Sequence, residues 1–107
     1  MTQYIEDILD ITKGENDSYE FKVQIPDNHE KYLKTAVAFA NGSGGRLIFG
    51  IRDHTWDVVG IPDDDVNTDC EAITNSIYDA CAPHIIASVR VEKIDGNSIF
   101  LVVVVGL

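Results

Sequence analysis

The sequence is short of the residues that build disulfide frameworks and membrane spans. Its only cysteines are Cys70 and Cys81, and a helix would hold residues with that spacing about 16 Å apart, too far for a disulfide. Two free thiols fit a reducing compartment. The longest apolar run, Ile99 to Val105, is well below the roughly 18 residues of a membrane helix, and the first residues are acidic where a signal peptide is basic. We therefore expect a cytoplasmic protein without a membrane partner.

Positive charge is also scarce, because eight lysines and arginines stand against 18 aspartates and glutamates and give a net charge of −10. A surface that binds phosphate groups needs basic side chains, so their placement matters more than their number. Residues 22–52 hold five bases and two acids, whereas residues 1–21 and 53–107 are strongly acidic. Any contact with nucleic acid is therefore expected within residues 22–52.

Proline is rare too, with three residues in 107, and 45% of the side chains are hydrophobic. A chain of this length and composition can bury one core, so one compact domain is expected. The final residues, Gly106 and Leu107, follow directly on an apolar run. We therefore expect residues 1–107 to be a single domain and an N-terminal fragment of a longer protein.

Apolar residues repeat at helical spacing in some segments, and they alternate or run continuously in others. The last two strands flank Asp95-Gly96, a hairpin turn signal, and the second of them is expected in the centre of the sheet. The order predicts an α+β domain, with a mixed β-sheet of about five strands and about three packed helices. Helices are expected over residues 4–9, 28–41 and 66–80, and strands over residues 18–25, 46–52, 58–61, 87–94 and 97–105.

Three glycines fall within residues 41–45, between the end of an expected helix and the start of a strand. Their backbone can adopt positive φ and approach a ligand closely. The segment lacks the Gly-Lys-Ser/Thr ending of a nucleotide-binding phosphate loop, and it follows a helix where such a loop precedes one. Backbone chemistry alone favours a tight connection between helix and strand over a binding loop.

Other polar clusters fit structural roles. The acids Asp63 to Asp65 suit the start of a helix better than a metal site. Trp56 is expected to pack over the sheet rather than to stack on a base. The histidines have no metal-ligand spacing and are expected at the surface; they are His29, His54 and His84.

Several segments follow a shared pattern in order and spacing, and they are Ser18–Lys22, Ala36–Gly45, Leu47–Ile51, Asp53 and Val58–Ile61. Together they resemble the Schlafen AlbA-type DNA-binding domain family, over about residues 6–105, and the composite is specific although each piece alone is weak. The resemblance implies a domain found in bacterial and archaeal transcriptional regulators, in helicase-like proteins and in the vertebrate Schlafen proteins. It also implies nucleic acid, DNA or RNA, as the partner.

The first hypothesis is therefore a DNA-binding module of a transcriptional regulator. Basic side chains would contact phosphates, and the glycine-rich backbone would approach the nucleic-acid strand. The residues expected in this contact are Lys22, Lys31, Lys34, Asn41, Gly42, Gly44, Gly45, Arg46 and Arg52.

A second hypothesis is a metal-dependent endoribonuclease, because some Schlafen members use two glutamates five apart and an aspartate just after the glycine-rich strand. The matching residues are Glu15, Glu20 and Asp53, which would hold Mg²⁺ or Mn²⁺, with Lys22 on the phosphate or leaving oxygen. The alternative is that Glu20 and Lys22 form a surface ion pair and that Asp53 caps a turn. Because the chain lacks a broad basic groove, binding without catalysis and without a cofactor is favoured.

A third hypothesis is a protein-interaction or dimerisation module. It suits the acidic surface and the apolar strand at the end of the sequence. A homodimer is therefore left open beside the nucleic-acid partner.

Overall fold

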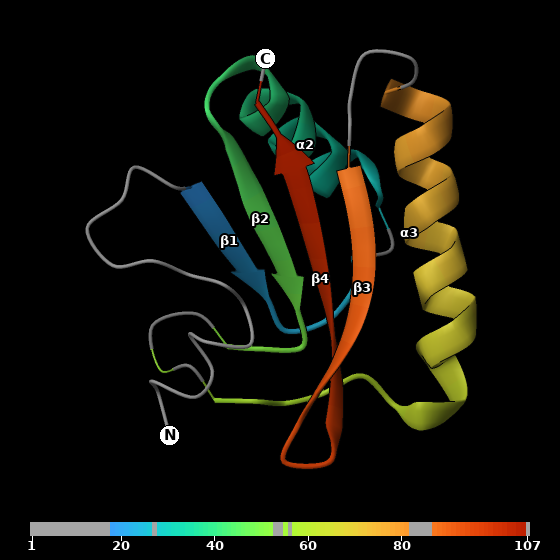
Figure 1. Ribbon diagram of the computed structural model, residues 1–107. Helices are drawn as coiled ribbons and strands as arrows, with labels where there is room; N and C mark the ends of the chain where they lie inside the picture. Colours follow the sequence, from blue (N-terminus) through green and yellow to red (C-terminus); the bar gives the residue numbers. More distant parts are fainter. Residues whose placement is uncertain (1–17, 27, 53–54, 56, 82–86, 107) are drawn as a thin grey trace.

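The computed structural model describes residues 18–26, 28–52, 55, 57–81 and 87–106, which form a four-stranded sheet with helices (Figure 1). The strand order is β1-β2-β4-β3. β1 runs parallel to β2, and the β2–β4 and β3–β4 pairs are antiparallel. The expected α+β class with a mixed sheet is confirmed. The elements are β1 (Ser18–Lys22), α2 (Glu30–Asn41), β2 (Gly44–Phe49), a 3₁₀ turn (Asp63–Asp65), α3 (Val66–Cys81), β3 (Ala87–Ile94) and β4 (Asn97–Val105).

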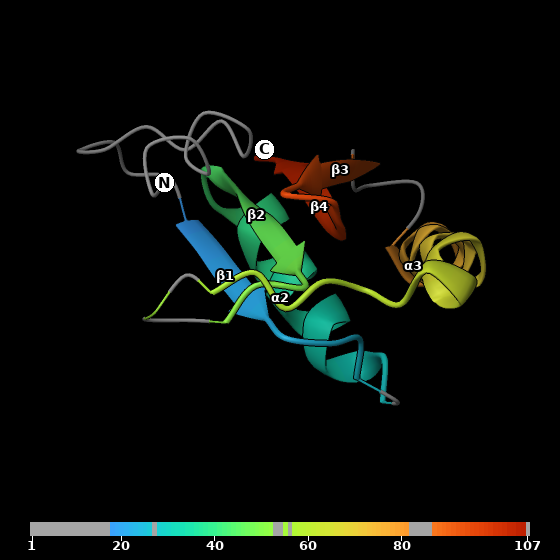
Figure 2. The ribbon, with the colours of Figure 1, turned by 90° about the horizontal axis from the view of Figure 1, so that it is seen from below.

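Figure 2 shows α2 and α3 on the same side of the sheet. This arrangement follows from their apolar stripes, because Tyr32 and Ala36 on α2 and Ile73 on α3 are fully buried. They pack against strand residues that point to the same face, among them Phe49 and Phe100. Cys70 is a free, half-buried cysteine packed against this core. None of the described helices is long and apolar enough to cross a membrane.

The opposite face of the sheet is also apolar. Phe21, Ile48, Ile99 and Leu101 are buried there, in a cluster separate from the one under the helices. Central strands with buried residues on both faces read as continuous apolar runs rather than as alternating ones. The apolar runs of β2 and β4 therefore match strands with buried residues on both faces, and the expected central place of β4 is confirmed.

The expected strand over residues 58–61 is wrong. Val58 and Ile61 form only isolated bridges, to Ile51 and Ser98. Gly50, before this segment, and Gly60, within it, have φ values of 108° and 83°, a backbone conformation that favours glycine and departs from that of a strand. The sheet of the described residues therefore has four strands rather than five.

Other expected boundaries also change, and β2 spans Gly44–Phe49 rather than residues 46–52. β1 ends at Lys22 rather than at residue 25, and α2 begins at Glu30, whose N–H donates to the Asn28 side chain at 3.0 Å. The helix expected over residues 4–9 lies outside the described residues. Of the three expected helices, the described part of the chain contains two.

Candidate nucleic-acid interface

A small polar cluster lies at the β1 edge of the sheet. Glu20 and Lys22 pair with Leu47 and Phe49, so both side chains point to the face that carries the helices. Lys22 Nζ lies 3.6 Å from Glu20 Oε2, and the Thr35 hydroxyl of α2 donates to the same oxygen at 3.4 Å. The Lys22 and Glu20 side chains are 31% and 39% exposed, so water reaches the pair. This geometry matches the surface ion pair that was one of the two expectations for these residues.

Two more lysines lie on α2, the helix that carries Thr35. Lys31 and Lys34 are exposed, and Asn41 is exposed on the same helix. At about 100° per residue, these three side chains project from the side of α2 that faces away from the core. Lys31 also lies in the first turn of α2, where the helix dipole adds positive potential. We refer to Lys22, Lys31, Lys34 and Asn41 as the lysine flank.

The glycine-rich segment is a packed junction between α2 and β2. Gly44 and Gly45 are buried, and a Cβ on Gly45 would lie 2.6 Å from the Phe39 ring. Gly44 has a φ of 90°, and its own Cβ would lie 2.6 Å from the Val104 carbonyl oxygen. Packing therefore explains why these two positions are glycine, and Gly42 is the glycine of the segment that stays exposed.

Arg46 and Arg52, the two arginines expected to contact nucleic acid, do not belong to the lysine flank. Arg46 pairs with Tyr19 and Val103, on the face of the sheet opposite to the helices. Arg52 is exposed after the end of β2, and its N–H donates to the Asp57 carbonyl at 2.9 Å. The alternation of side chains along β2 can be read from the sequence, and it could have placed Arg46 on the face opposite to the helices.

Only one of the expected metal ligands can be placed. Glu15 and Asp53 lie outside the described residues, as do His54 and Trp56, whereas Glu20 sits in the polar cluster at the β1 edge. Within the ranges that the structure describes, no group of three acidic, histidine or cysteine side chains could hold a metal ion. Gly50 N–H donates to the Lys22 carbonyl at 2.7 Å, so the segment that leads toward Asp53 starts beside the end of β1.

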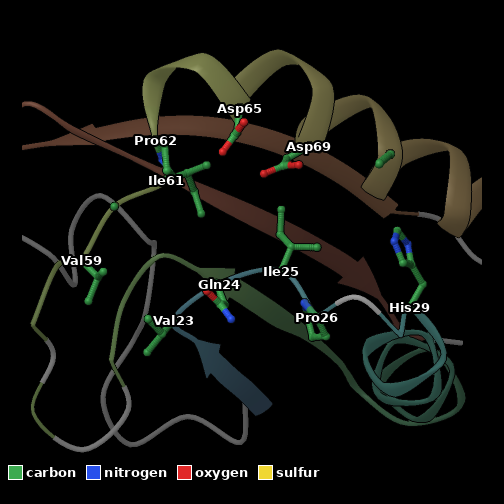
Figure 3. A pocket seen from close by; sticks show the side chains of 12 residues that line it. Val23, Gln24, Ile25, Pro26, His29, Val59, Ile61, Pro62, Asp65 and Asp69 are labelled. Carbon is green, nitrogen blue, oxygen red and sulfur yellow. The ribbon is translucent and has the colours of Figure 1, made fainter.

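A pocket of about 500 Å³ opens between the segment after β1, the segment before the 3₁₀ turn and the start of α3 (Figure 3). Apolar side chains such as Ile25 and Ile61 form its walls, and Asp65 and Asp69 lie on the side of α3. Burial raises the pKa of the Asp69 carboxyl, and the neighbouring charge of Asp65 adds to the rise. Two carboxylates repel phosphate, so this pocket does not belong to the nucleic-acid interface.

His29 connects the two helices at the edge of this pocket. Its Nδ1 lies 2.7 Å from the Tyr32 hydroxyl oxygen and 2.8 Å from Ser76 Oγ of α3. Burial raises the pKa of the Tyr32 hydroxyl, and the Ser76 side chain partly offsets the rise. His29, expected at the surface, is half-buried. Ser76 is 47 residues away in sequence, so no local spacing could reveal this contact.

The family model described as "Schlafen, AlbA_2" matches residues 15–105, which span all the described helices and strands. The chain belongs to this family. The resemblance expected from the motifs is confirmed, and the match covers both the lysine flank and the glycine junction of this Schlafen AlbA_2 domain.

Three proteins illustrate the relationship. An uncharacterised ATP-binding protein of Ureaplasma parvum is 38% identical over 73 residues, which are 66% of this chain and 21% of that protein. The structure of the DIP2311 protein from Corynebacterium diphtheriae gives a TM-score of 0.62 at 22% identity, over 99% of this chain and 22% of that one. The third is the N-terminal domain of a Nitrosomonas europaea protein named as a putative ATP-dependent DNA helicase RecG-related protein. It gives a TM-score of 0.58 at 23% sequence identity, over 94% of this chain and 71% of that one.

The two solved structures share the fold of this Schlafen AlbA_2 domain at low sequence identity. The chain spans about a fifth of the U. parvum relative and of the C. diphtheriae protein.

Proposed function

We propose that this Schlafen AlbA_2 domain binds nucleic acid through the lysine flank, and that the nucleic acid is DNA. The domain would then act as the DNA-binding module of a transcriptional regulator. The observation that carries the proposal is that three of the chain's eight basic residues lie on β1 and α2, two elements that the contact between Glu20 and Thr35 joins. Lysine binds phosphate as a mobile point charge, and several lysines along one side suit a phosphate backbone. The name of the N. europaea structural relative, which refers to a DNA helicase, supports the same ligand class.

Glu20 would compete with phosphate for Lys22. Its carboxylate holds Lys22 at 3.6 Å, so a phosphate approaching Lys22 competes with an ion pair that is already made. Lys31 and Lys34 are more exposed, and they would make the first contacts. Phosphate contacts of this kind read no sequence, so binding with little sequence preference is expected from the domain alone.

Charge reversal at Lys34 tests the proposal. Fluorescence anisotropy with labelled duplex DNA, single-stranded DNA and RNA at low salt is expected to show binding by the unaltered chain. Lys34→Glu should weaken it by about tenfold or more, because a phosphate contact is lost and a repulsion is added.

Lys93→Glu is the matched control. Lys93 is exposed on β3, at the sheet edge opposite to β1, and the substitution changes the net charge by the same amount. It should leave the affinity close to that of the unaltered chain. The proposal fails if no nucleic acid binds at low salt, or if both substitutions weaken binding equally, because the effect would then be one of net charge.

A metal-dependent endoribonuclease is the second proposal, and the position of Glu20 favours it. Its partly exposed carboxylate lies at the β1 edge, and the chain leading to Asp53 begins beside it. Carboxylate oxygens are suitable ligands for Mg²⁺ or Mn²⁺, which would activate water when bound. Incubation of transfer RNA with Mn²⁺ should then give cleavage that Asp53→Ala abolishes. Cleavage unchanged in that variant would point to a contaminating nuclease.

A further inference from the structure

Among the residues that the structure describes, the strand β3 has an open edge. It is the last strand of the four in the sheet that the described residues form, and Ser88, Arg90, Val91 and Lys93 are exposed along it. An exposed strand of eight residues is a template on which another strand can pair. The surface is distinct from the lysine flank, whose residues lie on β1 and α2.

The hairpin turn decides which backbone groups of β3 are available. Asp95 and Gly96 both have positive φ, at 51° and 82°, as in a two-residue type I′ turn. In this kind of hairpin the closing pair, here Ile94 and Asn97, exchanges hydrogen bonds, and bonded pairs then recur at every second residue. Even-numbered residues of β3 therefore bond to β4. The N–H and C=O groups of the odd-numbered residues point to the open edge, and these include Val89, Val91 and Lys93.

The side chains along this edge form a self-complementary pattern. Arg90 and Glu92 pair with Leu101 and Ile99, so both lie on the face opposite to the helices. Their side chains are 49% and 32% exposed, with Arg90 Nε and Glu92 Oε1 3.9 Å apart. Val91, between them, is 41% exposed and points to the other face. A positive and a negative residue thus lie symmetrically about one apolar position.

We infer that this edge pairs with the β3 edge of a second copy of the chain, antiparallel and two-fold symmetric, in the register centred on Val91. In that register Arg90 lies opposite Glu92 of the partner subunit, and Glu92 lies opposite Arg90 of the partner subunit. The groups that meet in the centre are the outward N–H and C=O groups of Val91 and of the partner's Val91. Two-fold pairing of identical surfaces is the commonest form of homodimer.

The charges select this register over its neighbours. A symmetric register centred on Arg90 would place two arginines directly opposite one another, and one centred on Glu92 would do the same with two glutamates. Like charges directly opposite destabilise a strand pair, and opposite charges stabilise it. Lysine on an edge strand normally discourages pairing, but in the Val91 register Lys93 lies opposite Val89 of the partner subunit, and no charge faces its like.

An exposed aromatic ring extends the same surface. Tyr78 on α3 is 73% exposed, and α3 lies beside β3 at the edge of the molecule (Figure 1). Ser76 faces α2, where it contacts His29, and Tyr78 projects about 200° further round the helix at about 100° per residue. The ring is therefore turned away from α2, toward the side on which the second copy would lie. Tyrosine is enriched in protein interfaces.

A charge-swap series measured by light scattering across a concentration range tests the dimer. The unaltered chain should change from monomer to dimer as its concentration rises. Arg90→Glu and Glu92→Arg should each raise the dissociation constant by about tenfold or more, because symmetry converts both charge pairs of the interface into repulsions. The double variant, Arg90→Glu with Glu92→Arg, restores opposite charges and should return dimerisation toward its original strength.

Val91→Pro adds a test of the backbone contact. The Val91 N–H points to the open edge, so proline removes a bond of the dimer and none of those to β4. This variant should stay monomeric, with thermal unfolding by circular dichroism confirming that each variant folds. A chain that is monomeric at every concentration, or a dimer that both single charge variants preserve, would overturn the inference.

Discussion

Gly45 shows how closely the helices approach the sheet. A Cβ at this position would lie 2.6 Å from the Phe39 ring of α2, so a methyl group there needs the helix or the ring to move. Gly42, three residues earlier, has an ordinary φ of −113°, and its Cβ would meet nothing nearer than 3.6 Å. Packing therefore requires glycine at position 45, and it does not require glycine at position 42.

The two glycines give a matched pair of substitutions. Gly45→Ala should lower the free energy of unfolding by about 1–3 kcal/mol, as overpacked core positions do. Gly42→Ala should change it by less than about 1 kcal/mol, and in the stabilising direction if the reduced freedom of the unfolded chain dominates. Urea denaturation of both variants measures the difference. Equal losses of stability in the two would show that Phe39 does not press on β2.

The Asp69 carboxyl, near the start of α3, is expected to make the stability of the folded chain depend on pH. Burial and the charge of Asp65 raise the pKa of its carboxyl, so the folded chain binds a proton there more tightly than the unfolded chain. Stability from this group is present in acid below the unfolded pKa, and it is lost as pH rises through the raised pKa of the folded state. The charged form of Asp69 therefore opposes folding at neutral pH.

Asp69→Asn should remove this dependence. Its stability relative to the unaltered chain is expected to be greater at neutral pH than in acid, and the gain should appear as pH rises through the acidic range. Urea unfolding at several pH values, with Asp79→Asn as a control at an exposed position of the same helix, measures the effect. A difference between Asp69→Asn and the unaltered chain that does not vary with pH would contradict the assignment.

At the scale of elements, local chemistry made some structures predictable. The hairpin of β3 and β4 has the expected bounds because Asp95-Gly96 accepts the positive φ values that its turn needs. Residues 58–61 look equally strand-like, yet they form only isolated bridges. The backbone at Gly50 and Gly60 has positive φ, and a Cβ at these positions would lie 3.0 Å from Ile99 and from Asn97, residues that are distant in the sequence.

The candidate site was also predictable from the sequence only in part. Helical spacing sufficed to expect Lys31 and Lys34 on the surface of α2, and strand alternation links Glu20 with Lys22. The contact of Thr35 with Glu20 and the packing of the glycine junction were not predictable, because both join segments that meet only in the folded sheet.

At the scale of the whole molecule, charge is divided between parts of the fold. The net charge is −10, yet the lysine flank lies on β1 and α2, and the pocket with Asp65 and Asp69 lies beside the start of α3. At an ionic strength of 0.1 M, charges more than about 10 Å apart are largely screened, so local lysines can bind phosphate in an acidic protein. The β1 and β3 edges are at opposite ends of the sheet, so nucleic-acid binding and the inferred dimer can be separated by mutation.

The salt dependence of DNA affinity is the measurement that most directly tests whether the lysine flank binds phosphates. The logarithm of the association constant should fall linearly with the logarithm of salt concentration. Lys34→Ala should reduce the magnitude of that slope by about 1, because one phosphate contact is lost. Lys93→Ala, at the opposite edge of the sheet, should leave the slope unchanged. An unaltered slope for Lys34→Ala, in a variant that still folds and binds DNA, would contradict a phosphate contact at α2.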